Sequence, residues 1–349
     1  MSKSAGLKAQ LFFIFAGVPR AMHRIEIRNN KHFDCDSNTT LFEGAKNAEI
    51  ILEHSCLTGR CSSCKVKVLE GSVEETVPNT ILTDQEKAEG FILSCICKPT
   101  SDCKLDVEDL EGIDLPVSKT VPAKVDEVNF LKDDVVQLIL RMPPTANFRY
   151  LSGQYVNLIQ GGIKRAYSVA NAFVAGGKME FFIKNYPGGL MSSYLFGKAK
   201  KEDLLRMEGP KGTFFMRKPK YDQLVFLATG TGIAPVKAML EEMDRNAQDY
   251  RGIKVYVLWG ARYEADLFWT PQYENIDLTY FPTLSRGDEN WSGERGYIQE
   301  VLINQVKDIS KSQVYACGSD QMIASAKAAL FAGGLSEHDF YSDAFVSSN

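Results

Sequence analysis

Long apolar runs are missing from this sequence of 349 residues: nothing in it approaches the ~20 apolar residues that a membrane-spanning helix needs. The longest stretch, residues 11–18, follows Lys3 and Lys8 and is shaped like the apolar part of a signal peptide. Neither a small-x-small cleavage site nor a twin arginine accompanies it. We therefore interpret residues 1–21 as a leader that stands outside the protein proper, which starts at Met22, and we expect no membrane partner.

An excess of positive charge is missing as well. The chain has 40 Lys and Arg against 44 Asp and Glu, a net charge of -4. Without a basic field to gather phosphates, nucleic acid is not an expected partner. The hydrophobic share of 44% and the charged share of 24% are those of an ordinary globular protein, and the length favours two or three domains.

Cysteine is scarce, with eight residues in all, which is far below the density of a disulfide scaffold. Seven of the eight lie between Cys35 and Cys103. Such clustering in a long chain indicates a metal centre in one module and a reducing, cytoplasmic location.

Residues 22–112 form an acidic module, with ten Lys and Arg against 17 Asp and Glu. Strand-like segments at 23–27 and 64–69 flank a helical pattern at 41–52, which predicts an α+β domain. The acidic surface is either a docking face for a charged protein or a solvated face without such a role. Residues 113–120 contain Pro116 and little periodicity, and we interpret them as a linker.

Residues 121–218 carry strand-like runs at 135–140, 155–159 and 179–184, separated by turns rich in Gly and Pro. This pattern predicts an all-β barrel.

Residues 219–349 alternate apolar strands with helices. The strands are expected at 224–227 and 255–259 and a helix at 235–246, with further strand and helix pairs around Val301 and around 314–329. The alternation predicts a parallel, doubly wound α/β sheet.

The densest chemical signal is the string SCLTGRCSSC, in which Cys56, Cys61 and Cys64 are spaced C-x4-C-x2-C. Cys95 follows after 30 residues. This is the spacing of a plant-type [2Fe-2S] cluster, whose two irons need four thiolates. Zinc is the alternative, although structural zinc sites favour a short pair of ligands in both halves. Cys97 is an alternative to Cys95 as fourth ligand.

A flavin-binding pattern lies in the β-rich region. Arg165 and Tyr167 are two residues apart on a predicted strand, so both side chains project from one face. The guanidinium can pair with a pyrophosphate and the phenol ring can lie against a flavin, and Ser168 can reach the N5 edge of the flavin. Downstream, the turn PGGLMSS (187–193) opens a helix and offers free backbone donors to phosphate. Read alone, this turn is equally well a loop and helix cap without a ligand.

A nucleotide-binding pattern follows a strand and opens a helix at LATGTGIAP (227–235). Pro235 replaces the third glycine of the usual dinucleotide fingerprint, and it suits the first turn of a helix. Cys317 and Gly318 end the last predicted strand, where a cysteine can sit beside a nicotinamide ring or be a buried structural residue. Arg262 could pair with a 2′-phosphate, but Glu264 would repel it, so NADH is favoured over NADPH.

In this order, RAYS, GGLMSS, ATGTGIAP and ACG resemble the ferredoxin–NADP reductase superfamily. With a plant-type ferredoxin in front, the chain looks like a three-domain iron–sulfur flavoreductase. The strings at 142–155, 206–215, 314–323 and 340–346 are similar to the CDP-6-deoxy-Δ3,4-glucoseen reductase family. Reductase components of ring-hydroxylating dioxygenases and multicomponent monooxygenases share the layout and are the alternative.

The resemblance implies a β-grasp ferredoxin domain, a flavin-binding barrel and a nucleotide-binding α/β domain, with NADH as donor to FAD, one [2Fe-2S] cluster and an iron–sulfur dehydrase as electron acceptor. We expect a monomer. By the same resemblance, the FAD contacts are Arg165, Tyr167, Ser168, Gly189, Leu190, Met191 and Ser192; the nucleotide contacts are Thr229, Gly230, Thr231, Gly232, Ile233, Ala234 and Gly318; and Ser168, Cys317 and Phe345 lie nearest the chemistry, Phe345 as a cover for the flavin ring. A plain electron carrier with an inactive reductase half, or a zinc-binding structural protein, is the rival hypothesis. Ser62 departs from the family pattern, which has Gly there.

Overall fold

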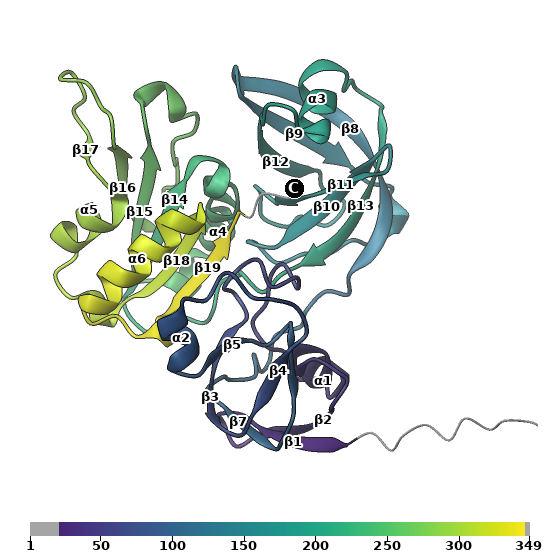
Figure 1. Cartoon of the computed structure of the whole chain (residues 1–349). Coiled ribbons are helices and arrows are strands. Elements are labelled where there is room, and N and C mark those ends of the chain that lie inside the picture. The colour runs from purple at the N-terminus through teal and green to yellow at the C-terminus, as the bar shows by residue number, and fades with distance from the viewer. Residues whose placement is uncertain (1–20, 346–349) are drawn as a thin grey trace, which may run out of the picture. The chain divides into compact units, whose positions relative to one another are not determined.

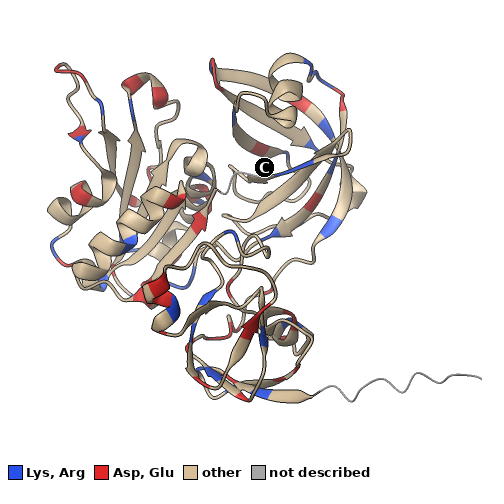
Figure 2. Ribbon diagram, in the orientation of Figure 1, with Lys and Arg blue, Asp and Glu red and all other residues tan. Residues whose placement is uncertain are grey.

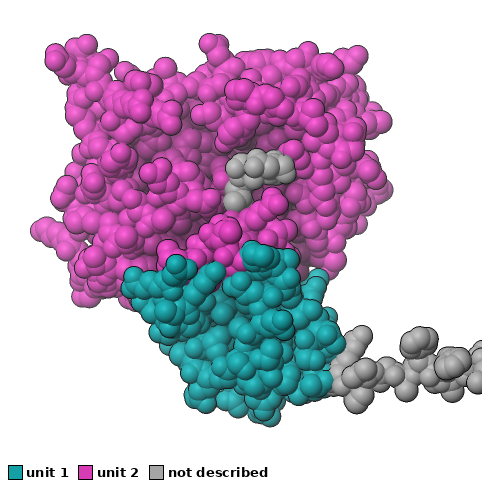
Figure 3. Space-filling model, viewed as in Figure 1, with its two compact units in different colours: residues 1–52, 66–78, 84–109 teal, residues 53–65, 79–83, 110–349 magenta. Residues whose placement is uncertain are grey.

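The computed structural model describes residues 21–345, so the predicted leader falls outside the described residues except for Ala21. The chain divides into two compact units (Figure 3). Unit 1 comprises residues 1–52, 66–78 and 84–109, and unit 2 comprises 53–65, 79–83 and 110–349. The loop that carries Cys56, Cys61 and Cys64 therefore belongs to unit 2.

Unit 1 is a small mixed sheet with one principal helix, as the predicted α+β module requires (Figure 1). The strand order is β2-β1-β7-β3-β5, with β1 antiparallel to β2 and parallel to β7. The elements are β1 (Met22–Glu26), β2 (His32–Asp36), α1 (Leu41–Asn47), β3 (Lys65–Glu70), α2 (Asp84–Ala88), β5 (Phe91–Leu93), β7 (Cys103–Leu105) and the separate pair β4 (Val73–Glu75) and β6 (Cys97–Pro99). Acidic side chains mark α2 (Figure 2).

Helix α1 ends earlier than the apolar pattern predicts. The Thr40 hydroxyl caps the start of the helix by accepting from the backbone N–H of Glu43. In turn, the Glu43 carboxylate accepts from the backbone N–H of Thr40. Glu49 then adopts a left-handed φ of 59°, and the N–H of Ile50 donates to the carbonyl of Ala45 at 2.9 Å. This turn closes the helix, so Leu52 packs in the core from a loop rather than from the helix.

The first half of unit 2 is a curled antiparallel sheet in the order β11-β10-β13-β8-β9-β12 (Figure 1). Its elements are β8 (Lys119–Lys132), β9 (Val135–Arg141), β10 (Tyr155–Gln160), β11 (Ile163–Ser168), β12 (Met179–Lys184), α3 (Leu190–Gly197) and β13 (Leu204–Lys211), with a short 3-10 turn η1 (Pro144–Ala146). Alternate side chains of these strands, among them Val136, Leu138 and Leu140 of β9, face a common apolar core. The sheet is the predicted barrel in half-barrel form.

The second half of unit 2 is a parallel sheet in the order β17-β16-β15-β14-β18-β19. Its elements are β14 (Gln223–Thr229), α4 (Ile233–Arg245), β15 (Lys254–Ala261), β16 (Asp277–Leu284), β17 (Glu294–Arg295), α5 (Ile298–Gln305), β18 (Gln313–Gly318), α6 (Asp320–Ala332) and β19 (Phe340–Ala344), with short 3-10 turns η2 (Gly230–Gly232), η3 (Ala247–Tyr250), η4 (Glu264–Asp266), η5 (Ile309–Lys311) and η6 (Glu337–Asp339).

Helices cover both faces of this parallel sheet, as the side-chain alternation of β14 shows. Phe226 and its alternate neighbours pack with α4, whereas Val225 and Leu227 pack with α5 and α6. The run of buried residues through β14 is therefore apolar on both faces, which is typical of a doubly wound sheet. The strand order reverses between β14 and β18, and the carboxyl ends of these two strands mark the expected ligand crevice.

Candidate functional site

The cysteine loop, which we define as residues 53–65, brings two of the predicted ligands together. The Cys61 thiol donates to the Cys56 sulfur, with 3.1 Å between the two Sγ atoms. The backbone N–H of Cys56 points at the Cys61 sulfur at 3.5 Å, and that of Thr58 points at the Cys56 sulfur at 3.4 Å. Cys64 is buried at the end of the same loop.

The environment of this pair favours a thiolate. The hydrogen bonds from Cys61 and Thr58 lower the pKa of Cys56 to about 4, against a smaller opposing effect of burial. The thiolate is the form that binds iron, and backbone N–H groups turned toward the sulfurs stabilise its charge. Within residues 21–345 the structure gathers no three His, Cys, Asp or Glu side chains into a metal site. In a two-iron cluster each iron takes two of the four cysteines, and Cys56 and Cys61 are in contact as two ligands of one iron would be.

Cys95 belongs to unit 1, where it lies buried in a turn between β5 and β6. The N–H of Ile96 donates to the carbonyl of Leu93 at 3.1 Å and closes this turn. Cys97 lies on β6 and is fully buried, and desolvation raises the pKa of its thiol to about 12. Cys35 is buried and donates toward the carbonyl of Thr39, and burial raises its pKa to about 11. Both thiols are neutral core groups.

Several contacts hold the cysteine loop within unit 2. The N–H of His54 donates to Thr213 Oγ1 at 2.8 Å, and the N–H of Thr213 donates to the His54 carbonyl at 2.9 Å. Ser63 Oγ donates to the carbonyl of Ser342 in β19. Ser62, the residue that departs from the family pattern, accepts from Lys327 of α6 at 3.4 Å. The departure therefore provides a contact that Gly could not make.

The flavin pattern lies on β11, as predicted. Arg165 and Tyr167 are both half-buried, and because they are two residues apart on β11 their side chains lie on one face of the strand. Burial raises the pKa of Tyr167 to about 12, which keeps the phenol neutral. No carboxylate among residues 21–345 pairs with Arg165, whose guanidinium donates to the Lys164 carbonyl. A guanidinium without a carboxylate partner suits a phosphate group.

The glycine turn before α3 has the form of a phosphate cradle. Gly189 caps the helix without a side chain, and Gly188 adopts a left-handed φ of 77°. The first N–H groups of α3 therefore have no side-chain acceptor. Ser192 is buried, and its Oγ accepts from the N–H of Tyr186 at 3.2 Å. Met191 packs in the barrel core, so only its backbone can face a ligand, whereas Leu190 is exposed.

The nucleotide loop joins β14 to α4 at the point where the strand order reverses. A Cβ at Gly232 would overlap the carbonyl of Cys317, and a Cβ at Gly318 would overlap Thr229 Oγ1. Gly230 has a left-handed φ of 54°, and the indole N–H of Trp259 donates to its carbonyl at 3.0 Å. The two chain segments therefore touch backbone to backbone, and α4 begins without a side-chain cap. This arrangement leaves backbone N–H groups for a pyrophosphate.

The predicted residues at the carboxyl edge of β18 lie around this loop. Cys317 is fully buried, and desolvation raises the pKa of its thiol well above the usual value, so it is neutral. Phe345 donates its N–H to the Gly318 carbonyl at 2.8 Å and packs partly against the core around α4. Arg262 and Glu264 follow β15 and are both exposed.

Asp343 is a residue that the sequence analysis did not single out. It lies on β19 opposite Cys317 and is only 4% exposed. Desolvation raises its pKa to about 6, although a hydrogen bond from Ser55 opposes the shift. Burial of a carboxyl group is visible only in three dimensions, so the pattern FYSDAFV held no local signal for it.

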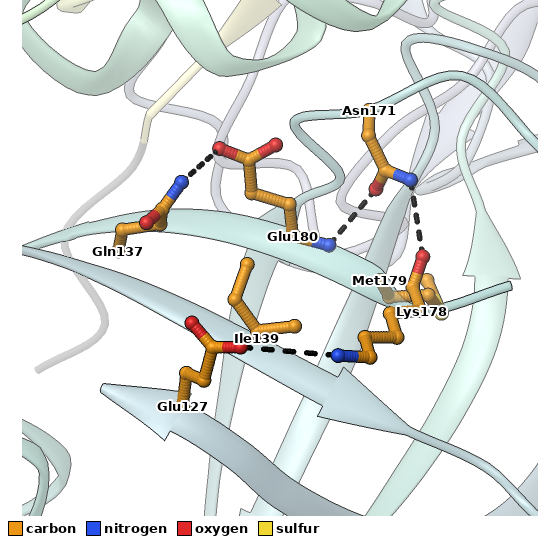
Figure 4. Close-up of a pocket in the computed structure, with 7 residues that line it drawn as sticks. All are labelled: Glu127, Gln137, Ile139, Asn171, Lys178, Met179 and Glu180. Carbon is orange, nitrogen blue, oxygen red and sulfur yellow. Dashed lines mark hydrogen bonds and ion pairs between the residues drawn. The ribbon is translucent and has the colours of Figure 1, made fainter. Parts of the chain in front are cut away.

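A polar cavity of about 320 Å³ opens on the sheet at β12 and β9 (Figure 4). Glu180 accepts from Gln137 on one side, and its N–H donates to the side chain of Asn171 on the other. Glu180 also pairs with Lys237 of α4 at 2.7 Å, and this ion pair is largely buried. The pair ties the strand that follows the flavin pattern to the helix that follows the nucleotide loop.

Protein-family comparisons match three successive parts of the chain. The 2Fe-2S iron-sulfur cluster binding domain matches residues 25–100, the oxidoreductase FAD-binding domain 122–216 and the oxidoreductase NAD-binding domain 226–328. These matches confirm the three predicted cofactors and the predicted multi-domain fold. Among residues 21–345, no helix has the length and apolarity to cross a bilayer.

The chain is 39% identical over 322 residues to the CDP-6-deoxy-L-threo-D-glycero-4-hexulose-3-dehydrase reductase of Yersinia pestis, covering 90% of this chain and 96% of the relative. It is 36% identical over 327 residues to Protein RfbI of Salmonella typhimurium, covering 92% and 96%. Among solved structures, the ferredoxin reductase in carbazole 1,9a-dioxygenase shares the fold with a TM-score of 0.63 at 24% identity, covering 95% of this chain and 100% of that one.

Proposed function

The chain belongs to the family of the CDP-6-deoxy-L-threo-D-glycero-4-hexulose-3-dehydrase reductases, and from this membership we propose that it carries electrons from NADH through FAD and a [2Fe-2S] cluster to an iron–sulfur dehydrase of CDP-deoxysugar synthesis. Nicotinamide delivers two electrons at once and an iron–sulfur cluster accepts one, and FAD converts between the two. The protein supplies binding sites, orientation and shielding from water.

The observation that carries this proposal is the position of three ligand-binding segments within unit 2. The turn before α3, the loop 229–232 and the cysteine loop all belong to this one unit. The cysteine loop is bonded both to Thr213, which follows the barrel, and to β19 of the parallel sheet. A reductase that moves electrons between three cofactors needs all three sites close together.

Each site has residues for its group. Arg165 and the N-terminus of α3 hold the FAD pyrophosphate, Tyr167 lies against the flavin ring and Ser168 faces its reactive edge. Thr229 to Ala234 and Gly318 hold the NADH phosphates, with Cys317 beside the nicotinamide and Phe345 as cover of the flavin. Cys56, Cys61, Cys64 and Cys95 bind the cluster, with Cys97 on β6 as the alternative to Cys95.

The donor is NADH, because exposed Glu264 repels a 2′-phosphate near Arg262. We expect kcat/KM to be higher for NADH than for NADPH. A tenfold preference for NADPH would contradict this assignment.

Two measurements test the proposal. Anaerobic addition of NADH to the purified protein should bleach both the flavin and the iron–sulfur bands. Reconstitution with a CDP-sugar dehydrase and its substrate should then couple NADH oxidation to product formation, whereas a terminal oxygenase should not support turnover. Bands that persist after NADH addition would refute the reductase activity, and coupling to an oxygenase alone would refute the dehydrase as partner.

A further inference from the structure

We infer that Ser55 sets the position of the first cluster cysteine, Cys56, relative to the predicted flavin and nicotinamide residues. Tyr155 and Asp343 are the positioning residues that hold Ser55 in place. The inference deepens the proposed function and rests on it. Ser55 is 8% exposed and directly precedes Cys56, so its position determines where the cysteine loop begins its turn around the cluster.

The carbonyl and the hydroxyl of Ser55 each have a partner from a different part of unit 2. The Tyr155 hydroxyl donates to the Ser55 carbonyl at 2.8 Å. Ser55 Oγ donates to Asp343 Oδ1 at 2.7 Å, and this bond is buried. Tyr155 lies on a strand of the half-barrel and Asp343 on a strand of the parallel sheet, so one residue is held from two sides.

The Tyr155 side leads to the flavin pattern. Tyr155 pairs in register with Ser168 across the antiparallel strands β10 and β11. Its ring lies against Gly212, where an added Cβ would come within 3.0 Å of it, so the ring has little freedom. A tyrosine hydroxyl is protonated at neutral pH and can donate, and desolvation raises the pKa of Tyr155 further. One side chain thus connects the strand position of Ser168 to the residue before Cys56.

The Asp343 side leads to the nicotinamide pattern. Asp343 pairs in register with Cys317 across the parallel strands β18 and β19. Phe345 follows two residues later and is bonded to Gly318. The contact from Ser55 therefore ends on β19, which directly precedes the predicted cover of the flavin, Phe345. A bond between buried groups without water to replace it is costly to lose.

These contacts predict a specific loss when one of them is removed. In Tyr155→Phe, the Ser55 carbonyl loses its donor while the ring stays in place. Loss of one such hydrogen bond should raise the equilibrium constant for local opening of the cysteine loop by about fivefold. Electron passage to the cluster should suffer, whereas hydride transfer to FAD should not, because Tyr155→Phe leaves the backbone pairing of this strand position with Ser168 intact.

The test uses the full-length purified protein and two readouts. Hydrogen–deuterium exchange of residues 53–65 reports the hold on the loop, and the ratio of NADH-driven cytochrome c reduction to ferricyanide reduction reports passage through the cluster. Tyr155→Phe and Asp343→Ala should each raise exchange in the loop by about fivefold and lower the ratio, with ferricyanide reduction kept.

Matched controls come from the same unit. Tyr150 is also a buried barrel tyrosine, and its hydroxyl donates to the Asn171 carbonyl at 3.2 Å. Asp339 is buried and bonded to Lys220 and Tyr221. Tyr150→Phe and Asp339→Ala should leave both readouts unchanged. Where Asp343→Ala fails to fold, Ser55→Ala removes the same bond from its other end.

The outcomes separate this inference from the proposed function. A wild-type protein that reduces neither acceptor with NADH would refute the proposed function itself. An active wild type together with unchanged loop exchange in Tyr155→Phe and Ser55→Ala would overturn the inference. A lower ratio without faster exchange would overturn it too, since the effect would then not act through the loop.

Discussion

At the scale of single residues, Arg165 is the clearest test of the flavin site. It shares one face of β11 with Tyr167, and its guanidinium has no carboxylate partner among the described residues. Arg165→Ala should lower the FAD content of the purified protein, and excess FAD should restore it, because a charge-assisted pair to phosphate is worth about 1.5–3 kcal/mol. The measurement is the flavin-to-protein ratio by absorbance, with and without added FAD.

The neighbouring Lys164 is the control for Arg165. Lys164 pairs with Glu208 on the barrel surface and lies one residue away, so its side chain points to the other face of β11. Lys164→Ala should keep its FAD. Equal loss of FAD from both variants would show that Arg165 has no specific role in binding FAD.

Gly232 tests the nucleotide loop. Its backbone dihedrals are helical, so an alanine is not strained there, but the added Cβ would overlap the carbonyl of Cys317. Gly232→Ala should therefore separate the loop from β18 and raise the KM for NADH by about tenfold or more, a misplacement effect like those seen when reacting groups shift slightly. Steady-state kinetics with ferricyanide measure it.

Gly230 is a control with the opposite character. Space is open around its Cβ position, but its φ of 54° is left-handed. Gly230→Ala should cost about 1 kcal/mol of stability and change the KM less than Gly232→Ala does. The reverse order of the two KM values would contradict the close packing of the loop on β18.

At the scale of elements, β11 and β13 are linked through Glu208. This carboxylate pairs with Lys164 across β10 and with Lys211 at 2.8 Å, and these hydrogen bonds lower its pKa from the usual 4.5 to about 2. A depressed folded-state pKa stabilises the protein above pH 4.5, and the contribution is lost as the pH falls toward 2. With solvent screening, we expect about 1 kcal/mol at neutral pH.

Glu208→Gln measures this contribution. The variant should melt at a lower temperature than the wild type at pH 7, and the difference should shrink at pH 3, as followed by circular dichroism of cofactor-free protein. The exposed Glu264 provides a control, since Glu264→Gln should melt like the wild type at both pH values. If the difference in melting temperature between Glu208→Gln and the wild type grew as the pH fell, the ion pairs of Glu208 would not stabilise the sheet.

Among the elements, those with strong periodicity were predictable. Strands β9, β10 and β12 and helix α4 lie where their apolar patterns place them, within two residues at each end. Helix α1 was predicted too long, because residues up to Leu52 continue the apolar pattern while Glu49 turns the chain. A left-handed turn at a glutamate leaves no mark in the hydrophobic pattern.

At the scale of the whole molecule, one chain should hold a complete set of cofactors. We expect a monomer with one FAD, two irons and two acid-labile sulfides, because all four predicted cysteines and both phosphate loops come from the same chain. Light scattering coupled to absorbance, followed by iron and sulfide assays, measures this. A dimeric mass would contradict the prediction. So would iron without acid-labile sulfide, which is the result expected of a site that binds single metal ions through cysteines alone.

The sequence alone determined which chemistry this protein carries, because cysteine spacing and glycine-rich turns are local requirements of a cluster and of phosphate groups. It also determined the order of the three domains, since helix and strand periods are local as well. Only the tertiary structure decided how the sites are joined: Ser55 meets Tyr155 and Asp343 across 100 and 288 residues of chain. Burial and long-range pairing arise from packing of the whole unit, and no local pattern encodes them.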